Sequence, residues 1–302
     1  GQIPESYLYL NQGKGLFKTA SAVKAGMLTD IAIADLDGDK SPEIIVTGEW
    51  MAPAVFRIRN GQLQQGTTGL ESQKGWWQSV AAADLDGDGD TDLVLGNTGL
   101  NSYLKPSASK PVKLWINDFD KNGTADKIIT RTINGKDVPV FLKRELTEQM
   151  PSLKKQNLQF RDYANKSIHD LFGNNLVKQA AELTFNTGAS VVAWNNGKGG
   201  FTTELLPVWA QLSCINSILC TDINRDGKTD LLLGGNQFHF QPQFARLDAS
   251  YGLVLINKAG TGGKTSWESA PSAVTGLNLR GEIKEMKMIA MAGKEYLFVL
   301  QN

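Results

Sequence analysis

The sequence DLDGDGDTDLVLG, residues 84–96, places five aspartates within nine positions and then becomes apolar. Carboxylates this close repel one another, so a surface loop gains little from such crowding. The simplest reason to gather them is a hard cation bound between them, because such cations prefer oxygen ligands. The apolar residues that follow at once predict a β-strand. The stretch therefore predicts a cation-binding loop directly ahead of a strand.

The same pattern occurs three more times, as DLDGDKSPEIIVTG from Asp35, DFDKNGTADKIITR from Asp118 and DINRDGKTDLLLGG from Asp222. Each copy has acidic or amide side chains at positions 1, 3, 5 and 9, followed by a strand-like run. Repetition of this kind indicates a repeat architecture. The gap between the last two copies contains residues 143–182, whose Leu, Ile and Val spacing predicts amphipathic helices and hence a helical insertion.

Strand-like runs precede and follow each acidic loop, and further runs are joined by Asn-Gly turns of the hairpin type. Four-stranded antiparallel units repeated along a chain favour an all-β fold, a β-propeller of four-stranded blades. We predict one propeller domain over residues 1–302 with five blades, six or seven being the alternatives. The N-terminal hairpin, residues 7–20, is predicted to complete a last blade begun by residues 286–302, which removes the open edges.

An EF-hand does not explain these loops. That motif requires a bidentate Glu at position 12 between two helices. Position 12 is apolar here and lies within a predicted strand in all four copies, as Val46, Leu95, Ile129 and Leu233. The remaining alternatives are a shorter calcium loop between two strands and a set of solvated turns, since Asp, Asn and Gly all favour turns. Four copies in phase favour calcium.

The predicted ligands are side-chain oxygens at positions 1, 3, 5 and 9 and a backbone carbonyl at position 7. Oxygen-only ligands favour Ca²⁺, and the absence of His and Cys from the four loops argues against zinc or copper. We expect up to four structural Ca²⁺ ions, bound most tightly by the first two loops, which have four carboxylates each. The ligand residues are Asp35, Asp37, Asp39 and Glu43; Asp84, Asp86, Asp88, Asp90 and Asp92; Asp118, Asp120, Asn122, Thr124 and Asp126; and Asp222, Asn224, Asp226, Lys228 and Asp230.

At these loops the chain resembles the FG-GAP/VCBS repeats of integrin α-subunit propellers and of secreted bacterial proteins. The helical insertion and the stretch RLDASYGLVL, residues 246–255, look more like a bacterial group of extracytoplasmic VCBS-repeat proteins. The resemblance implies an exported protein that is secreted, periplasmic or associated with the outer membrane. It also implies a glycan or a protein at the cell surface as the partner. The N-terminus, GQIPESYLYL, has no basic region or apolar core, so no signal peptide is expected in this chain.

Composition narrows the classes of function. The formal net charge is zero, so no global basic field attracts a nucleic-acid backbone. No apolar run is long enough to cross a bilayer. The two histidines, His169 and His239, belong to no recognised catalytic motif, and the clustered carboxylates are explained by metal ligation. The sequence therefore does not indicate a catalytic site, and we expect calcium to stabilise the blades.

If the acidic loops lie on one face of the propeller, aromatic and amide residues gather on the other. Aromatic rings stack on sugars or anchor protein contacts, whereas packing between blades is the alternative for each of them. The predicted recognition residues are Trp50, Trp76, Trp77, Asn97, Asn101, Trp209, Asn236, Phe238, His239, Arg246, Tyr251 and Arg280.

The sequence thus predicts a calcium-stabilised extracytoplasmic binding module for a glycan or protein. One alternative is a propeller-type polysaccharide lyase or hydrolase, which would need Arg246, Arg280 or His239 over the channel. The other is a structural or assembly domain of a longer surface protein, whose aromatic face would be covered.

Overall fold

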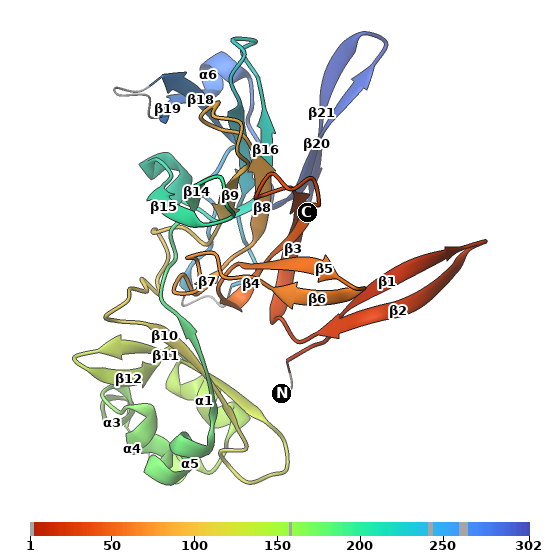
Figure 1. Cartoon of the computed structure of the whole chain (residues 1–302). Coiled ribbons are helices and arrows are strands. Elements are labelled where there is room, and N and C mark those ends of the chain that lie inside the picture. The colour runs from red at the N-terminus through yellow and green to blue at the C-terminus, as the bar shows by residue number, and fades with distance from the viewer. Residues whose placement is uncertain (1–2, 157–158, 241–243, 260–264) are drawn as a thin grey trace. The chain divides into compact units, whose positions relative to one another are not determined.

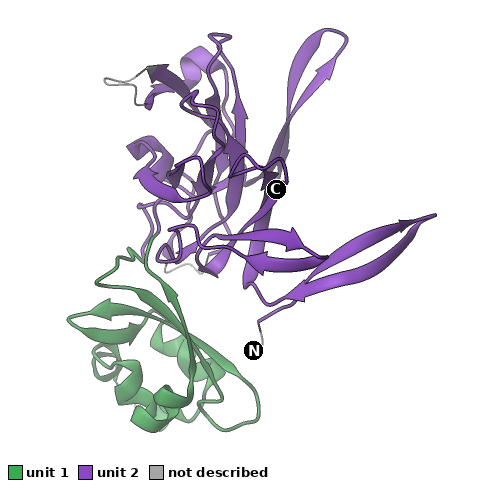
Figure 2. Ribbon diagram, viewed as in Figure 1, with its two compact units in different colours: residues 1–2, 104–187 green, residues 3–103, 188–302 purple. Residues whose placement is uncertain are grey.

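The computed structural model describes all residues except 1–2, 157–158, 241–243 and 260–264 (Figure 1). It is mostly β, with several antiparallel sheets, and the predicted all-β class fits it. The chain divides into two compact units (Figure 2). We call residues 104–187 the inserted unit, and residues 3–103 with 188–302 the repeat unit. No helix in the described ranges has the length and apolar character needed to span a membrane.

The repeat unit contains three antiparallel sheets built on one plan, in which neighbouring strands along the sheet follow the order of the chain. The first sheet comprises β3 (Met27–Ala34), β4 (Glu43–Met51), β5 (Ala54–Arg59) and β6 (Gln62–Gln65), and the short β7 (Gly75–Trp76) also pairs with β4. The second comprises β8 (Ser79–Ala83), β9 (Asp92–Gly96), β14 (Val191–Asn195) and β15 (Phe201–Leu205). The third comprises β16 (Ile215–Thr221), β17 (Asp230–Gly235), β18 (Leu253–Ala259) and β19 (Thr265–Ala270).

Two hairpins complete the repeat unit. One is β1 (Ser6–Gly13) with β2 (Leu16–Val23), and the other is β20 (Ile283–Met291) with β21 (Lys294–Gln301). Among the described residues each hairpin forms a two-stranded sheet of its own. Two short helices, η1 (Val208–Gln211) and α6 (Ser272–Thr275), lie in the connections that follow β15 and β19.

Apolar clusters hold successive sheets face to face. Side chains alternate between the two faces of a strand, so β9 points Leu93 and Leu95 toward the first sheet and Val94 toward the third. The third sheet in turn contributes Leu232 and Val254 to a cluster with Ile283 and Met286 of β20. This packing on both faces explains why β9 and β17 are buried throughout.

The inserted unit has its own sheet and its own core. Its strands run in the order β12 (Lys136–Pro139), β11 (Asp126–Ile133), β10 (Val112–Asn117) and β13 (Ala181–Phe185). Its helices are α1 (Lys143–Gln149), α2 (Leu153–Gln156), α3 (Phe160–Ala164), α4 (Ile168–Phe172) and α5 (Asn174–Gln179). Trp115 and Ile128 from the sheet and Phe119 from the loop between β10 and β11 pack against Leu146, Met150 and Ile168 from the helical segment.

The compact unit that contains the predicted helices is larger than the predicted insertion. The predicted helices are present between residues 143 and 179, but the compact unit that contains them begins at residue 104 and ends at 187. The third acidic loop, residues 118–126, lies between β10 and β11 and therefore belongs to the inserted unit. Among its described residues the repeat unit has one five-stranded sheet, two four-stranded sheets and two separate hairpins, so the count of five blades is not confirmed. The joining of the two hairpins into one blade stays a prediction.

The cluster between the first and second sheets should account for much of the stability of the repeat unit. Leu93→Ala, at a fully buried position, is expected to lower the free energy of unfolding by about 2–5 kcal/mol, because the truncated side chain leaves a cavity. Leu205→Ala, at a position of the same sheet that is 60% exposed, is the control and should cost far less. Chemical denaturation of both variants tests this, and equal losses would contradict the assigned core.

Candidate metal loops and recognition face

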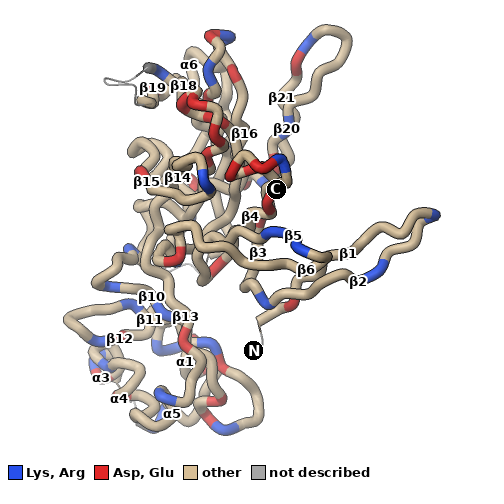
Figure 3. The backbone as a smooth tube through the Cα atoms, viewed as in Figure 1, with Lys and Arg blue, Asp and Glu red and all other residues tan. Residues whose placement is uncertain are grey.

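The acidic loops share one hydrogen-bond scheme that begins at position 1. In the second loop the Asp84 carboxylate accepts the backbone N–H of Gly87 (2.8 Å) and of Gly89 (3.0 Å). The side chains at positions 3 and 5 each accept the N–H two residues further on, as Asp86 does from Asp88. Asp and Asn form such local turns readily. The same contacts recur in the loop that begins at Asp35. In the loops that begin at Asp118 and Asp222 the first carboxylate accepts from position 5 instead of position 4, and the other contacts are the same. Figure 3 shows the acidic residues along the backbone.

Position 9 is a buried anchor. Asp92 accepts the N–H of Leu85, at position 2 of its own loop, through Oδ2 (3.1 Å), and the N–H of Asn195 on β14 through Oδ1 (2.8 Å). Asp230 makes the equivalent pair of contacts with Ile223 and Asn257. The pKa of the Asp92 carboxyl is raised to about 6, mainly by burial. The two N–H donors oppose this shift, and the charges of Asp86 and Asp88 add to it. Position 9 therefore ties the loop to the third strand of its sheet.

In three loops the carboxylates also converge. One oxygen from each of three acidic residues lies within 4.8 Å of the others, an arrangement that suits a cation. In the fourth loop, whose residues are all described, no such group is found. There, Asn224 donates to Asp226, and the nearby Lys228 and Lys258 also lower the pKa of that carboxyl. The converging groups are Asp35, Asp37 and Asp39; Asp84, Asp86 and Asp92; and Asp118, Asp120 and Asp126.

Arg57 makes the first loop different. Its guanidinium lies on Asp37 and on the buried Glu43, with 2.9 Å between Nε and Glu43 Oε1. Glu43 Oε2 accepts the N–H of Leu36, so position 9 keeps its usual contact with position 2. The longer Glu side chain and Arg57 thus replace the strand N–H that Asp92 and Asp230 use. Sequence reasoning missed Arg57, although a basic residue facing position 9 across β4 and β5 was a usable signal.

Two asparagines of third strands clamp each loop to the next sheet. The Asn195 side-chain amide donates to the carbonyls of Leu36 (2.8 Å) and Thr91 (2.8 Å). The Asn257 amide donates to Leu85 (2.6 Å) and Thr229 (3.0 Å). In both cases the first acceptor is position 2 of the preceding sheet's loop. A pocket of about 550 Å³ lies beside the second clamp and is lined by Asp84, Asp86, Lys228, Asn257 and Lys258, among others.

The structure corrects three of the predicted recognition residues. Trp77 is fully buried between the first two sheets and donates its indole N–H to the carbonyl of Gln73 (3.0 Å). Asn97 and Asn236 are also fully buried. The Asn236 amide bonds the backbone of Ser250 through both its oxygen and its nitrogen. These side chains support the loops that follow the second strands and do not reach a surface.

Trp50 and Trp76 belong to a continuous chain of aromatic rings. Ring centroids are 5.4 Å apart for Trp50 and Trp76, 5.8 Å for Trp76 and Phe240, 6.4 Å for Phe240 and Phe244, and 5.6 Å for Phe244 and Tyr103. Trp50 has a positive φ of 61°, a conformation that is costly for a bulky residue. It is buried, whereas Tyr103 is exposed. Sequence reasoning missed Phe244 and Tyr103 as members of this chain.

The other predicted recognition residues lie on or near the surface. Arg246 lies 4.0 Å from the ring centre of Phe238, and Arg280 lies 5.9 Å from that of Tyr251. Such contacts between a cation and a ring hold the guanidinium over the aromatic face. Three more predicted residues are accounted for in this group: Trp209 is exposed on η1, Asn101 donates to Leu212 (3.2 Å), and the exposed His239 has its Nδ1 3.1 Å from Glu282 Oε2.

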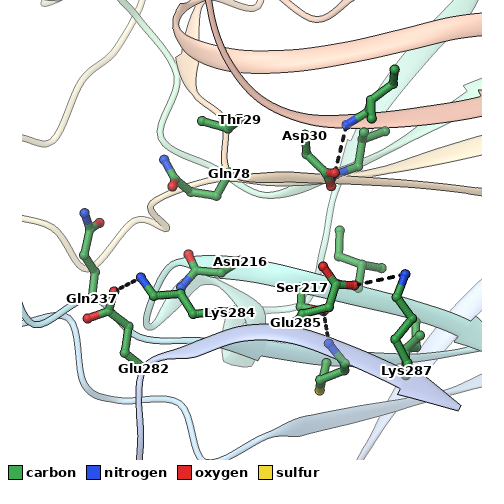
Figure 4. A pocket seen from close by; sticks show the side chains of 15 residues that line it. Thr29, Asp30, Gln78, Asn216, Ser217, Gln237, Glu282, Lys284, Glu285 and Lys287 are labelled. Carbon is green, nitrogen blue, oxygen red and sulfur yellow. Dashed lines mark hydrogen bonds and ion pairs between the residues drawn. The ribbon is translucent and has the colours of Figure 1, made fainter. Parts of the chain in front are cut away.

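The first strands of the three sheets and β20 line a polar pocket of about 620 Å³ (Figure 4). Asp30 of β3 accepts the N–H of Val80, and burial raises the pKa of its carboxyl. Lys284 pairs with the buried Glu282 on the opposite side. Of the three residues that the catalytic alternative requires, none lines this pocket.

The role of position 9 can be separated from metal binding. In the presence of a chelator, Asp92→Asn should lower the free energy of unfolding by about 1–3 kcal/mol, because it turns an acceptor into a donor that faces a buried N–H. Asp88→Asn, at an exposed position of the same loop, should change it by about 0.5 kcal/mol or less. Equal effects in urea denaturation would contradict the anchor.

Comparison with known families adds one finding. A family model matches residues 35–95, a segment that runs from the first acidic loop through strands β4 to β8 and ends in β9. It therefore contains two of the acidic loops. A search among curated proteins found no match. Residues 35–95 match the family model of the FG-GAP-like repeat, and the chain is similar to FG-GAP/VCBS repeat proteins in this segment.

Proposed function

We propose that this chain is a calcium-stabilised, extracytoplasmic binding module of the β-propeller type. The observation that supports it best is the repeated loop, in which one hydrogen-bond scheme turns the oxygens of positions 1, 3, and 5 or 9 toward one another. Repeats of the FG-GAP type are typically extracellular, which supports a location outside the cytoplasm. The sheets that follow one another face to face support the propeller arrangement.

Calcium would act here as a structural ion. Each acidic loop joins the first and second strands of a sheet, and in the repeat unit the loops of the first and second sheets also bond an asparagine of the next sheet. An ion bound to the loop would neutralise carboxylates that otherwise repel one another and would fix both connections. Because such an ion binds the folded loop and not the unfolded chain, its binding free energy adds to the stability of the fold.

The four sites should differ in strength. The second loop provides carboxylates only, and among the described residues no basic side chain forms an ion pair with them. In the first loop Arg57 already neutralises Asp37 and Glu43, so a cation has to displace or share that contact. The third and fourth loops have Asn122 and Asn224 in place of a carboxylate, and the fourth also has Lys228. We therefore expect the second loop to bind calcium most tightly, with the first loop weaker than its charge alone suggests.

Calorimetric titration of chelator-treated protein with Ca²⁺ tests the metal assignment. Saturating calcium should raise the melting temperature, since an ion at 100 times its dissociation constant stabilises by about 2.7 kcal/mol. The double variant Asp86→Asn, Asp88→Asn keeps the turn acceptors but removes two charges, and it should abolish the tightest binding event. Asp248→Asn, an exposed aspartate outside the loops, is the control. No heat of binding and no melting shift in the unaltered protein would overturn the assignment.

The aromatic chain is the surface that we assign to recognition of a glycan. Trp76 is half-buried between Trp50 and Phe240, and the exposed ring of Tyr103 continues the row. Planar rings in a row stack on the apolar faces of successive sugars, and neighbouring amides such as Asn101 offer hydrogen bonds. A protein partner is the second candidate, favoured by the same rings. The lyase or hydrolase alternative has less support, because His239 and the two arginines do not line the polar pocket of about 620 Å³.

A glycan array probed with the protein in calcium tests this surface. Trp76→Ala should reduce binding at least tenfold, because it removes the ring that links Trp50 to Phe240. Trp209→Ala, at an exposed tryptophan on η1, is the control and should leave binding unchanged. Equal losses in both variants, or binding that survives Trp76→Ala, would contradict the assigned surface. A protein partner captured through Trp76 without any glycan signal would favour the second candidate.

A further inference from the structure

The two separate hairpins of the repeat unit are unusually apolar for elements on a surface. Tyr9 is 54% exposed on β1, Phe17 65% on β2 and Phe298 58% on β21. In the described chain neither β1 nor β21 pairs with a strand outside its own hairpin. Exposed strand edges beside apolar side chains favour pairing with another strand. The question is which strand each edge is built to accept.

The hairpin β1–β2 repeats the hairpin β14–β15. Residues 11–17 read NQGKGLF and residues 195–201 read NNGKGGF, so five of the seven positions are identical. The register is the same, with Asn11 opposite Phe17 and Asn195 opposite Phe201. The asparagine makes the same turn contact, accepting the N–H of the glycine two residues on. Since β14–β15 forms the third and fourth strands of the second sheet, β1–β2 has the features of a third and fourth strand.

The hairpin β20–β21 corresponds to a first and second strand. Leu297 and Val299 of β21 pack toward the third sheet, as Leu93 and Leu95 of β9 pack toward the first. Within its own hairpin Leu297 lies opposite Met288, as Leu93 lies opposite Ala82. By this equivalence the free edge of β21 corresponds to the edge of β9 that pairs with β14.

We propose that β1–β2 docks on β21 of the same chain, as the third and fourth strands of a fourth sheet that β20 and β21 begin. The register follows from the second sheet, where Val191, Val192 and Ala193 lie opposite Leu95, Val94 and Leu93. Transferred to the hairpins, it places Tyr7 opposite Val299, Leu8 opposite Phe298 and Tyr9 opposite Leu297. Tyr7 and Tyr9 then face the third sheet, and Leu8 faces the first.

In this arrangement Asn11 supplies a third clamp. Asn195 and Asn257 each bond position 2 of the preceding acidic loop, and the corresponding acceptor for Asn11 is the carbonyl of Ile223. Ile223 is 40% exposed, whereas its counterparts Leu36 and Leu85 are buried beneath the next sheet. The fourth acidic loop also lies next to the start of β21, with Arg225 3.6 Å from Glu295. The position-2 residue of this loop thus lacks the cover that a completed fourth sheet provides.

The faces of the sheets indicate that the hairpin β1–β2 docks within its own chain and not on a second copy. Apolar clusters join the first sheet to the second, the second to the third, and the third to β20–β21. The first sheet leaves Ile31 and Ile33 exposed on its other face, and β21 leaves Tyr296 and Phe298 exposed. The end of β2 and the segment that follows it already lie on that face of the first sheet, where Val23 and Ala25 pack beside Val46 and Phe56. The hairpin is therefore tethered at the junction that it would close.

Cysteine cross-linking tests the register. In the variant Leu8→Cys, Phe298→Cys, facing residues would have Cα atoms about 4.5–5.5 Å apart, which suits a disulfide. Mild oxidation should give a monomer lighter by two hydrogens, in calcium and in chelator alike. The matched control, Leu8→Cys with Tyr296→Cys, is out of register and should form far less. Burial raises the pKa of the native Cys214 and Cys220 thiols to about 12, so they should not compete.

Two outcomes of the cross-linking would overturn the proposal. Disulfide-linked dimers in place of the oxidised monomer would show that the hairpin docks on a second copy of the chain. A yield equal to that of the out-of-register control would show that the hairpin does not occupy this edge.

A second measurement does not depend on added cysteines. Asn11→Asp keeps the oxygen that accepts from Gly13 but removes the amide that would bond Ile223. It should lower the melting temperature by about as much as Asn195→Asp, which removes a clamp seen in the structure. Gln12→Glu adds the same charge at the next position and is the control. If Asn11→Asp melts like Gln12→Glu, Asn11 forms no clamp and the proposal fails.

Discussion

Both units depend on a buried carboxylate at position 9 of each acidic loop. A buried charge is tolerated only when hydrogen bonds replace the water that it loses. One oxygen always takes the N–H of position 2, which closes the loop, as in the contact of Asp92 with Leu85. The other oxygen accepts from a donor that differs between the loops. The donor is a strand N–H for Asp92 and Asp230, the Arg57 guanidinium for Glu43 and the Gln149 amide for Asp126. The loop is thus constant, and its outer connection varies.

This division explains why the loops were predictable and their surroundings were not. Asp, Asn and Gly at fixed spacing specify local turns, so the four loops and the strands beside them follow from the sequence alone. The partners of position 9 lie outside the loop, and of these only Arg57, which faces Glu43 across β4 and β5, had a signal in the sequence. The contacts of Asn195 and Asn257 had none either, since their acceptors lie in a preceding sheet. Long-range pairing is the information that composition and spacing do not contain.

The misplaced elements have related causes. The third acidic loop has the pattern of the others, yet it lies in the inserted unit, because the motif requires only a pair of strands and not a repeat array. Trp77, Asn97 and Asn236 were predicted to belong to a recognition face because of their type and their place, Asn97 and Asn236 after second strands and Trp77 in a connection between sheets. Those positions connect neighbouring sheets, where a large ring fills the core and an amide bonds loop backbone. Residue type alone does not separate these roles.

The asparagine clamp also connects each acidic loop to the sheet that packs on it. A cation at an acidic loop would order position 2, whose carbonyl accepts from the next sheet, so ion binding and sheet packing would support each other. Leu36 and Leu85 are each covered by a following sheet, and the carbonyl of each accepts from the asparagine of that sheet. In the described chain Ile223 belongs to the loop with the fewest converging carboxylates and is followed by no sheet of four strands. Because no converging group of carboxylates is found in this loop, we expect its order to come from packing, and Asn11 on an exposed hairpin is the equivalent side chain.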